Sequence, residues 1–252
     1  AARAILPESL ISLKREVVSR YNKMTGPLPY REFDNYDDYW QQRKSVAYTA
    51  RRWKLAADEI ESGSSVIDIG CGSGEFLEYL INRKENLEVE GTDYSSKAVK
   101  MAAEKGFSTK PYDVTSGPLD SMHDYVTLFE VIEHVPEAEL ALRNIKNAFI
   151  KQLIISIPNV GYIGSRLRLA VFGRYPITMC VFHVKEHVRL WTVKDFKEWM
   201  LMEGLVVTKI EGQYGPSWLP WKRFPGLCAS GLVYFIEHQE RWHEEPSADS
   251  RD

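Results

Sequence analysis

Cysteine, net charge and long apolar runs are all scarce in this chain, and each shortage excludes a class of protein. Three cysteines in 252 residues are an odd count without metal-ligand spacing, which argues against a disulfide framework. No metal site is predicted. A net charge of −3 leaves no overall basic excess for gripping phosphates, so nucleic-acid binding is not expected. No run approaches the roughly 18 apolar residues that cross a bilayer.

The N-terminus lacks a recognisable targeting signal. The sequence begins at Ala1, without an initiator methionine and without the charged, apolar-cored segment of a secretory signal peptide. We therefore expect a cytoplasmic location, and either a processed chain or a domain of a larger protein. A chain of 252 residues can bury one sizeable core plus an appended cap.

The most informative motif is a glycine-rich turn between an apolar run, residues 66–69, and an amphipathic stretch from residue 75. Glycines remove side chains where a turn needs unusual dihedral angles and where the backbone must approach a ligand closely. This is the layout of a strand, a tight loop and a helix N-terminus that holds a nucleoside-bearing cofactor. The positions that we expect to line it are Asp68, Gly70, Cys71, Gly72 and Gly74.

Two acidic residues indicate which cofactor this loop favours. A dinucleotide fingerprint counted from Gly70 needs a small residue at position 75, where the chain has Glu75. Asp68, inside the expected strand, suits a ligand with a positive charge better than a pyrophosphate. S-adenosylmethionine (SAM) has an ammonium and a sulfonium and no phosphate. The residues therefore favour SAM over a nicotinamide dinucleotide.

Three further expected strands end in polar residues that would complete the same site. An acid at the tip of the second strand of such folds accepts hydrogen bonds from ribose hydroxyls, which is the role expected of Asp93. Its alternative role is to cap the following helix. Asp113 could bind the adenine amine or could simply start a turn. The candidate cofactor-binding positions on these strands are Asp93, Tyr94, Asp113, Val114, Glu130 and Val131.

The order and spacing of these motifs resemble the class I SAM-dependent methyltransferases. The string from Glu130 to Val135 resembles the ubiquinone-pathway O-methyltransferases, and residues 157–178 and 187–196 are similar to the MetW-like methyltransferases. The resemblance implies an α/β fold with a Rossmann-like seven-stranded sheet and helices on both faces. It also implies an N-terminal helical lid, an insertion after the fifth strand, SAM as the cofactor and S-adenosylhomocysteine (SAH) as the product.

The expected organisation is one such domain with additions. Residues 1–62 are expected to form the helical extension, 63–240 the methyltransferase domain and 241–252 a polar tail. Apolar spacing predicts helices over 7–24 and from about 36 to 61. Further helices are expected over 75–83, 95–105, 137–148 and 192–203, with Ser95 and Thr192 as N-caps, and a late strand pair over 205–210 and 231–236.

The N-terminal extension supplies one more candidate. In related enzymes a lid folds over the cofactor, so Arg43 is expected to bind the methionyl carboxylate. At helical spacing, however, the aromatic residues around Arg43 could equally belong to the core.

The insertion over residues 158–190 is the expected acceptor-binding segment. It holds several cationic side chains against a single acid, Glu186, which favours an anionic acceptor: Arg166, Arg168, Arg174, Lys185 and Arg189. An amphipathic helix whose arginines face water explains the same pattern. The candidate general bases are His134, His183 and His187. His134 could instead cap a helix or line the cofactor pocket, and His187 could hydrogen-bond the backbone.

The sequence therefore predicts transfer of a methyl group from SAM to an oxygen or nitrogen of a small-molecule or glycan acceptor. A rival hypothesis is a SAM-binding partner or regulatory protein of the MetW type, without robust catalysis of its own. A homodimer is compatible with either.

Overall fold

The computed structural model describes residues 49–176, 187–216 and 218–240. Several positions discussed above lie outside these ranges: the helix expected over 7–24, Arg43, Lys185, Glu186, His183 and the tail 241–252. The expected N-terminal lid and the part of the insertion over 177–186 also lie outside them.

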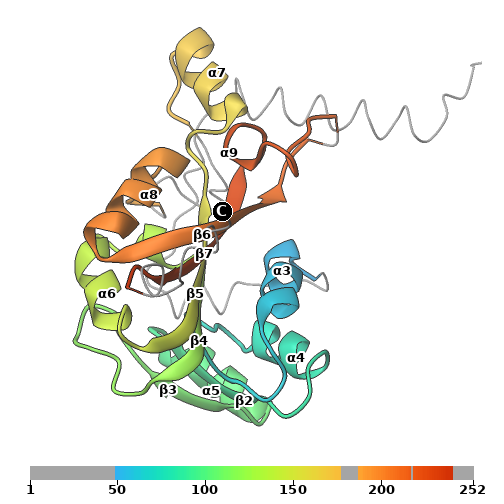
Figure 1. Ribbon diagram of the computed structural model, residues 1–252, viewed down its shortest axis with the longest axis vertical. Helices are drawn as coiled ribbons and strands as arrows, with labels where there is room; N and C mark the ends of the chain where they lie inside the picture. The colour runs from blue at the N-terminus through green and yellow to red at the C-terminus, as the bar shows by residue number, and fades with distance from the viewer. Residues whose placement is uncertain (1–48, 177–186, 217, 241–252) are drawn as a thin grey trace, which may run out of the picture.

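A seven-stranded sheet forms the centre of the chain, in the order β3-β2-β1-β4-β5-β7-β6 (Figure 1). All neighbouring pairs are parallel except those of β7, which runs antiparallel to β5 and β6. The strands are β1 Ser65–Ile69, β2 Glu88–Asp93, β3 Ser108–Pro111, β4 His123–Phe129, β5 Phe149–Pro158, β6 Leu205–Tyr214 and β7 Gly231–His238. This confirms the expected α/β sheet, including the late strand pair.

Helices cover both faces of this sheet (Figure 1). They are α3 Arg51–Glu59, α4 Glu75–Ile81, α5 Ser96–Glu104, η1 Ile132–His134, α6 Ala138–Ile145, α7 Ile163–Phe172, α8 Val193–Met202 and α9 Pro225–Cys228. Across residues 49–176, 187–216 and 218–240, every helix is too short or too polar to traverse a lipid bilayer.

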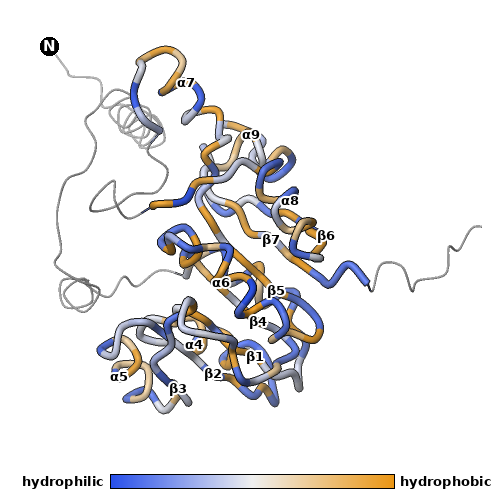
Figure 2. Tube along the Cα trace, turned by 90° about the vertical axis from the view of Figure 1, so that its left-hand side faces the viewer, coloured by the Kyte–Doolittle hydropathy of each residue, from blue (hydrophilic) through white to orange (hydrophobic). Residues whose placement is uncertain are grey.

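The two faces of the sheet carry different hydrophobic clusters, because neighbouring side chains of a strand point in opposite directions. On β7, Tyr234 packs with α6 and α8, whereas Val233 and Phe235 pack with α3 and α4. Ile154 and Ile155 divide in the same way on β5. Apolar residues accordingly run through the central strands in Figure 2. Burial on both faces fixes the register, so that the strand ends carrying the candidate residues are held together.

The helix predicted from about residue 36 to 61 is interrupted, which corrects the prediction. Residues 49 and 50 are not helical, and α3 begins only at Arg51. Ala50 is buried and extended, with φ −68° and ψ 137°, and its carbonyl accepts a hydrogen bond from the Trp53 amide. Alanine is the best helix former, so the intrinsic propensity of Ala50 does not explain why the helix starts only after it.

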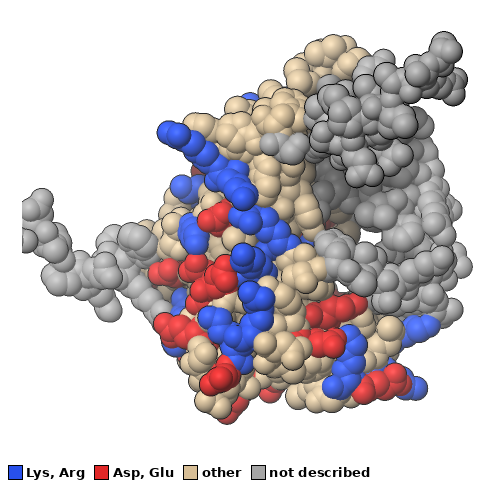
Figure 3. Space-filling model, turned by 90° about the vertical axis from the view of Figure 1, so that its right-hand side faces the viewer, with Lys and Arg blue, Asp and Glu red and all other residues tan. Residues whose placement is uncertain are grey.

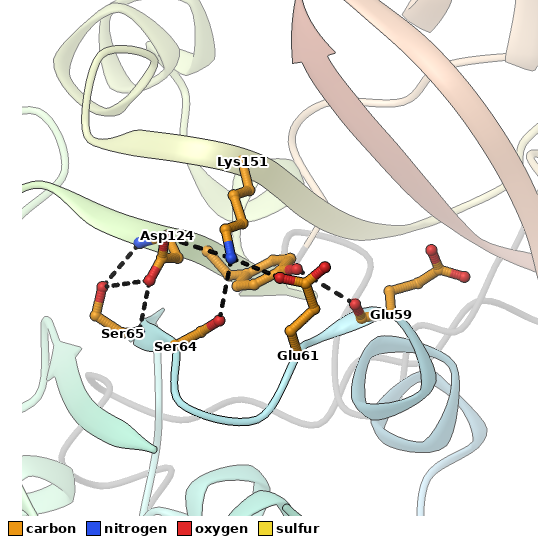
Figure 4. A network of polar contacts seen from close by, with 7 residues as sticks. Glu59, Glu61, Ser64, Ser65, Asp124 and Lys151 are labelled. Carbon is orange, nitrogen blue, oxygen red and sulfur yellow. Dashed lines mark hydrogen bonds and ion pairs between the residues drawn. The ribbon is translucent and has the colours of Figure 1, made fainter. Parts of the chain in front are cut away.

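The amino ends of the strands, opposite the candidate site, are joined by a polar network (Figure 4). The Asp124 carboxylate accepts a hydrogen bond from the Ser65 amide at 2.9 Å, and Lys151 pairs with Glu61 at 2.6 Å. The Ser65 amide and the nearby Lys151 charge hold the pKa of Asp124 below its ordinary value. Elsewhere, basic and acidic side chains are interspersed over the lower part of the face in Figure 3, in keeping with the small net charge.

The expected N-caps at Ser95 and Thr192 are confirmed. Ser95 accepts a hydrogen bond from the Ala98 amide, and Thr192 forms a capping box with Asp195 at the start of α8. We expect Thr192→Ala to lower the free energy of unfolding by about 1 kcal/mol, because an amide of α8 loses its acceptor. Urea unfolding would measure this loss. Thr192→Ser keeps the hydroxyl and should cost less, so an equal loss in both variants would contradict the capping role.

Candidate functional site

The candidate site lies where the carboxyl ends of β1, β2 and β4 meet. Pairing places Asp68 of β1 beside Gly91 of β2 and Thr127 of β4, and Asp93 ends β2. In open α/β sheets, ligands bind outside these carboxyl ends. The sheet therefore brings together the strand-tip residues that the sequence identified separately.

The glycine loop is a tight turn packed against the Val131 side chain. Gly70, Gly72 and Gly74 all have positive φ, of 76°, 56° and 78°. The Gly70 and Cys71 amides both donate to the Thr92 carbonyl, at 2.7 and 2.9 Å. A Cβ on Gly70 would lie 2.3 Å from the Val131 Cγ2 atom. Side chains are thus excluded here by both backbone conformation and space.

Asp93 holds this loop as well as ending β2. Its Oδ2 atom accepts a hydrogen bond from the Gly72 amide at 2.9 Å, and its Oδ1 atom accepts one from the Ser95 amide at 2.8 Å. A carboxylate oxygen can accept more than one hydrogen bond, so these two bonds do not by themselves exclude a ligand hydroxyl. Asp93 therefore links the glycine loop to the start of α5.

Asp68 is a buried carboxyl group, with 3% of its surface exposed. Its Oδ1 atom accepts a hydrogen bond from the Thr127 hydroxyl at 2.6 Å. Burial raises its pKa to about 7; the Thr127 bond opposes the rise, the charge of Asp93 adds to it, and the charge of Arg52 opposes it. A ligand cation beside Asp68 would restore the charged form.

The candidate adenine-binding residues Asp113, Val114 and Tyr94 differ in their surroundings. Asp113 uses its Oδ1 atom to accept hydrogen bonds from the Thr115 amide and hydroxyl, at 2.8 and 2.7 Å, so it does start a turn. Val114 is buried in the core cluster, whereas Tyr94 has 66% of its surface exposed. A cofactor role for these residues stays a prediction.

Cys71 behaves as a packing residue. It is buried with Leu77 and Ala102, and a Cβ on Gly91 would lie 2.8 Å from its Sγ atom. Burial raises the pKa of its thiol, which keeps it protonated and unreactive.

Glu130 follows β4 in a strained conformation, with φ 57°. Its Oε1 atom accepts hydrogen bonds from the Ser156 hydroxyl at 2.8 Å and from the Gln213 amide nitrogen at 2.7 Å. Side chains of β5 and β6 thus hold the turn that carries Val131 against the glycine loop. A non-glycine residue at positive φ persists only where its surroundings impose it, commonly at functional sites.

Two of the three candidate bases lie side by side. The His134 and His187 rings are 4.9 Å apart and inclined at 68°. Glu133 completes a cluster with them, since one ligand atom of each residue lies within 4.8 Å of the others. His187 is 53 positions from His134 in the sequence. Local spacing therefore gave no indication of this cluster.

Arg52 is a site residue that the sequence analysis missed. It donates a hydrogen bond to the Tyr214 hydroxyl at 3.1 Å, and its charge acts on both Asp68 and Glu133. Its position on the first turn of α3 places a guanidinium near the glycine loop. The arginine predicted for this role, Arg43, lies outside the described residues.

The described arginines of the insertion make internal contacts. Arg166 donates to the Gly161 carbonyl at 2.6 Å and Arg168 to the Tyr175 carbonyl at 2.7 Å. Arg189 donates to the Pro136 carbonyl and pairs with Glu139 at 2.9 Å. Arg166 and Arg168 thus contact their own segment, whereas Arg189 joins it to α6 and the turn before it; a role of these arginines toward the acceptor stays a prediction. Arg174 is exposed after the end of α7.

Comparisons with known proteins agree with this geometry. A family model described as a methyltransferase domain matches residues 39–210. A bifunctional methionine biosynthesis protein MetXA/MetW from Rhodopirellula baltica is 31% identical over 127 residues, which are 46% of this chain and 20% of that protein. A ubiquinone biosynthesis O-methyltransferase from Cupriavidus pinatubonensis is 34% identical over 86 residues, 31% of this chain and 34% of that protein.

A solved structure shows a similar fold over more of the chain. The TehB-like SAM-dependent methyltransferase from Corynebacterium glutamicum matches with a TM-score of 0.54 at 17% identity, over 81% of this chain and 97% of that one. By contrast, the chain spans 20% and 34% of the length of the two curated relatives.

Proposed function

The chain belongs to the family described by that methyltransferase domain, and from this premise we propose that it methylates an oxygen or nitrogen of a small-molecule or glycan acceptor. S-adenosylmethionine is the cofactor, and it supplies a methyl group already activated by the positive charge on sulfur. The protein then has mainly to align the reacting atoms and to exclude water.

The observation that carries this proposal is the glycine loop held by Asp93 beside the buried Asp68. The positive φ angles and the absence of Cβ atoms allow the tight turn that is proposed to face the nucleoside. Asp93 is proposed to bind the ribose hydroxyls and Asp68 the ammonium group. Arg52 is proposed to bind the methionyl carboxylate, because its charge lies near Asp68.

The adenine is proposed to lie at the next strand tip. Asp113 would accept a hydrogen bond from the adenine amine, and Val114, Tyr94 and Val131 would contact the ring. Cys71 is buried in the glycine loop, and Glu130 accepts a hydrogen bond from Ser156 of β5. Both are proposed to support the walls of the cofactor site.

The acceptor is proposed to bind on the η1 side of the site. His134 and His187 lie there and would handle the proton that the acceptor loses. An anionic acceptor is proposed from the cationic composition of the insertion, in which Arg174 is exposed after the end of α7. His183 remains a predicted base outside the described residues.

A SAM-binding partner protein of the MetW type is the alternative function. It is favoured by the similarity to the methionine biosynthesis protein, and it requires the same cofactor site without turnover. Cofactor binding is common to both hypotheses, so methyl transfer to an acceptor is what separates them.

The test of the cofactor site is isothermal titration of the purified chain with SAM, SAH and NADH. We expect dissociation constants on the order of micromolar for SAM and SAH, about −8 kcal/mol, and no comparable binding of NADH. Asp93→Asn should weaken SAM binding at least about tenfold, because the loop and the ribose share this carboxylate. Asp58→Asn, an exposed aspartate of α3, is the matched control. A folded chain that binds NADH but neither SAM nor SAH would overturn the proposal.

A further inference from the structure

We propose that Tyr214 is a positioning residue that holds Arg52 for the carboxylate of the cofactor's amino-acid tail. Its hydroxyl then determines how strongly the chain distinguishes a cofactor that carries this carboxylate from one that lacks it. Neither the family match nor a sequence motif assigns a role to Tyr214. The inference rests on the proposed function, in which Arg52 binds the methionyl carboxylate.

The direction of β6 brings Tyr214 to the edge of the sheet that carries the site. β7 runs antiparallel to both β5 and β6, so β6 runs in the same direction as β5 and the other parallel strands. Tyr214 is the last residue of β6 and pairs with Gly231, the first residue of β7, which also pairs with Pro158 at the end of β5. The carboxyl end of β6 therefore lies at the same edge as the carboxyl ends of β1 and β4.

Two successive arginines attach the first turn of α3 to this end of β6. The Arg51 Nε atom donates to the Gly212 carbonyl at 2.9 Å, and the Arg51 guanidinium lies 5.2 Å from the centre of the Trp221 ring. The Arg52 Nη1 atom donates to the Tyr214 hydroxyl at 3.1 Å. These contacts direct the Arg52 side chain, although 162 positions separate it from Tyr214.

The partners of the two arginines differ in charge. Arg51 lies 3.7 Å from the Glu211 carboxylate, so its charge is balanced by an acid of β6. The Tyr214 hydroxyl, by contrast, accepts a hydrogen bond from Arg52 and carries no negative charge. A guanidinium has five N–H donors and can bond a phenol and a carboxylate at the same time. The phenol therefore orients Arg52 without neutralising it, as an acid in the same place would.

The amino-acid tail of the cofactor is a zwitterion, with its ammonium and its carboxylate on the same carbon atom. Asp68, near the carboxyl end of β1, and Arg52, on the first turn of α3, present the two opposite charges. The charge of Arg52 also opposes the rise in the pKa of Asp68. An oriented arginine loses less conformational entropy when the carboxylate binds. Removal of the Tyr214 hydroxyl should therefore weaken only those ligands that carry the carboxylate.

The test is isothermal titration of the whole chain with SAH and with decarboxylated SAH, which keeps the ammonium but lacks the carboxylate. Tyr214→Phe should weaken SAH binding about five- to tenfold, the scale of a single hydrogen bond, and leave the affinity for decarboxylated SAH unchanged. Arg52→Gln should weaken SAH binding at least about tenfold, because a charge-assisted contact is lost. Adding Tyr214→Phe to Arg52→Gln should cause no further loss, since Tyr214 acts through Arg52.

Tyr125→Phe is the matched control, because the Tyr125 hydroxyl donates to the carbonyl of Glu59 at the opposite end of α3. It should leave both affinities unchanged, and thermal unfolding of the same samples checks that each variant is folded. Unchanged SAH affinity in Tyr214→Phe, an equal loss for both ligands, or a further loss in the double variant would overturn the role of Tyr214. A folded wild-type chain that binds neither ligand would instead overturn the proposed function, and this inference with it.

Discussion

Gly70→Ala is expected to weaken SAM binding by about 10- to 100-fold. The new Cβ would lie 2.3 Å from the Val131 Cγ2 atom, closer than packed carbon atoms approach, so Val131 or the loop must move. Overpacking of this kind typically costs about 1–3 kcal/mol. Val131 cannot retreat freely, because Ile132 beside it is fully buried in η1. Titration calorimetry with SAM would measure the loss of affinity.

Gly63→Ala is the control for this prediction. Gly63 has φ 79°, close to the 76° of Gly70, but a Cβ there would meet no atom within 4 Å. The two substitutions therefore share the cost of a left-handed conformation, about 1 kcal/mol, and differ in the steric clash. We expect Gly63→Ala to lower stability while leaving SAM affinity unchanged. Equal SAM affinity in both variants would show that the loop does not need its close contact with Val131.

The contacts that were predictable from sequence are those set by neighbouring residues. The glycine turn, the strand tips at Asp68 and Asp93 and the cap at Thr192 each depend on a few adjacent positions. Periodicity also located most helices, because one apolar face of each packs on the sheet. The parallel sheet then brings the strand tips together without further information from side chains.

The contacts that were not predictable depend on packing between distant segments. Arg52 reaches the site because α3 begins at Arg51, and no residue near 50 signals that start. The Glu130 side chain, at a position of positive φ, is held by Ser156 and Gln213, which are 26 and 83 positions away. His187 meets Glu133 only through a segment that crosses η1. Long-range contacts of this kind decide which candidate residues share a site.

Asp68→Asn is expected to stabilise the ligand-free chain at pH 8. The pKa of this carboxyl is raised from 3.8 to about 7 in the folded protein, chiefly by burial. Between these two values the folded chain holds a proton that the unfolded chain has released. The free energy of unfolding contributed by Asp68 therefore falls as pH rises from about 4 to 7, and the loss is complete above pH 7.

The size of this effect follows from the shift. About three pKa units correspond to roughly 4 kcal/mol, which sets an upper scale for the gain at pH 8. The asparagine keeps the hydrogen bond to the Thr127 hydroxyl through its own carbonyl oxygen. Urea unfolding of both proteins at pH 5 and pH 8 isolates Asp68, because the other titrating groups are shared. A stability difference that is the same at both pH values would contradict the raised pKa.

The same substitution should weaken SAM binding, so that stability and function change in opposite directions. The bound ammonium favours ionised Asp68, and below pH 7 the carboxyl must first release its proton. Wild-type affinity for SAM should therefore rise up to about tenfold per pH unit as pH increases toward 7, and then level off. Calorimetry in buffers of different ionisation enthalpy would detect the released proton. Asp68→Asn should bind SAM weakly without this pH dependence; if it instead retained both the affinity and the proton release, Asp68 would not be the group that meets the ammonium.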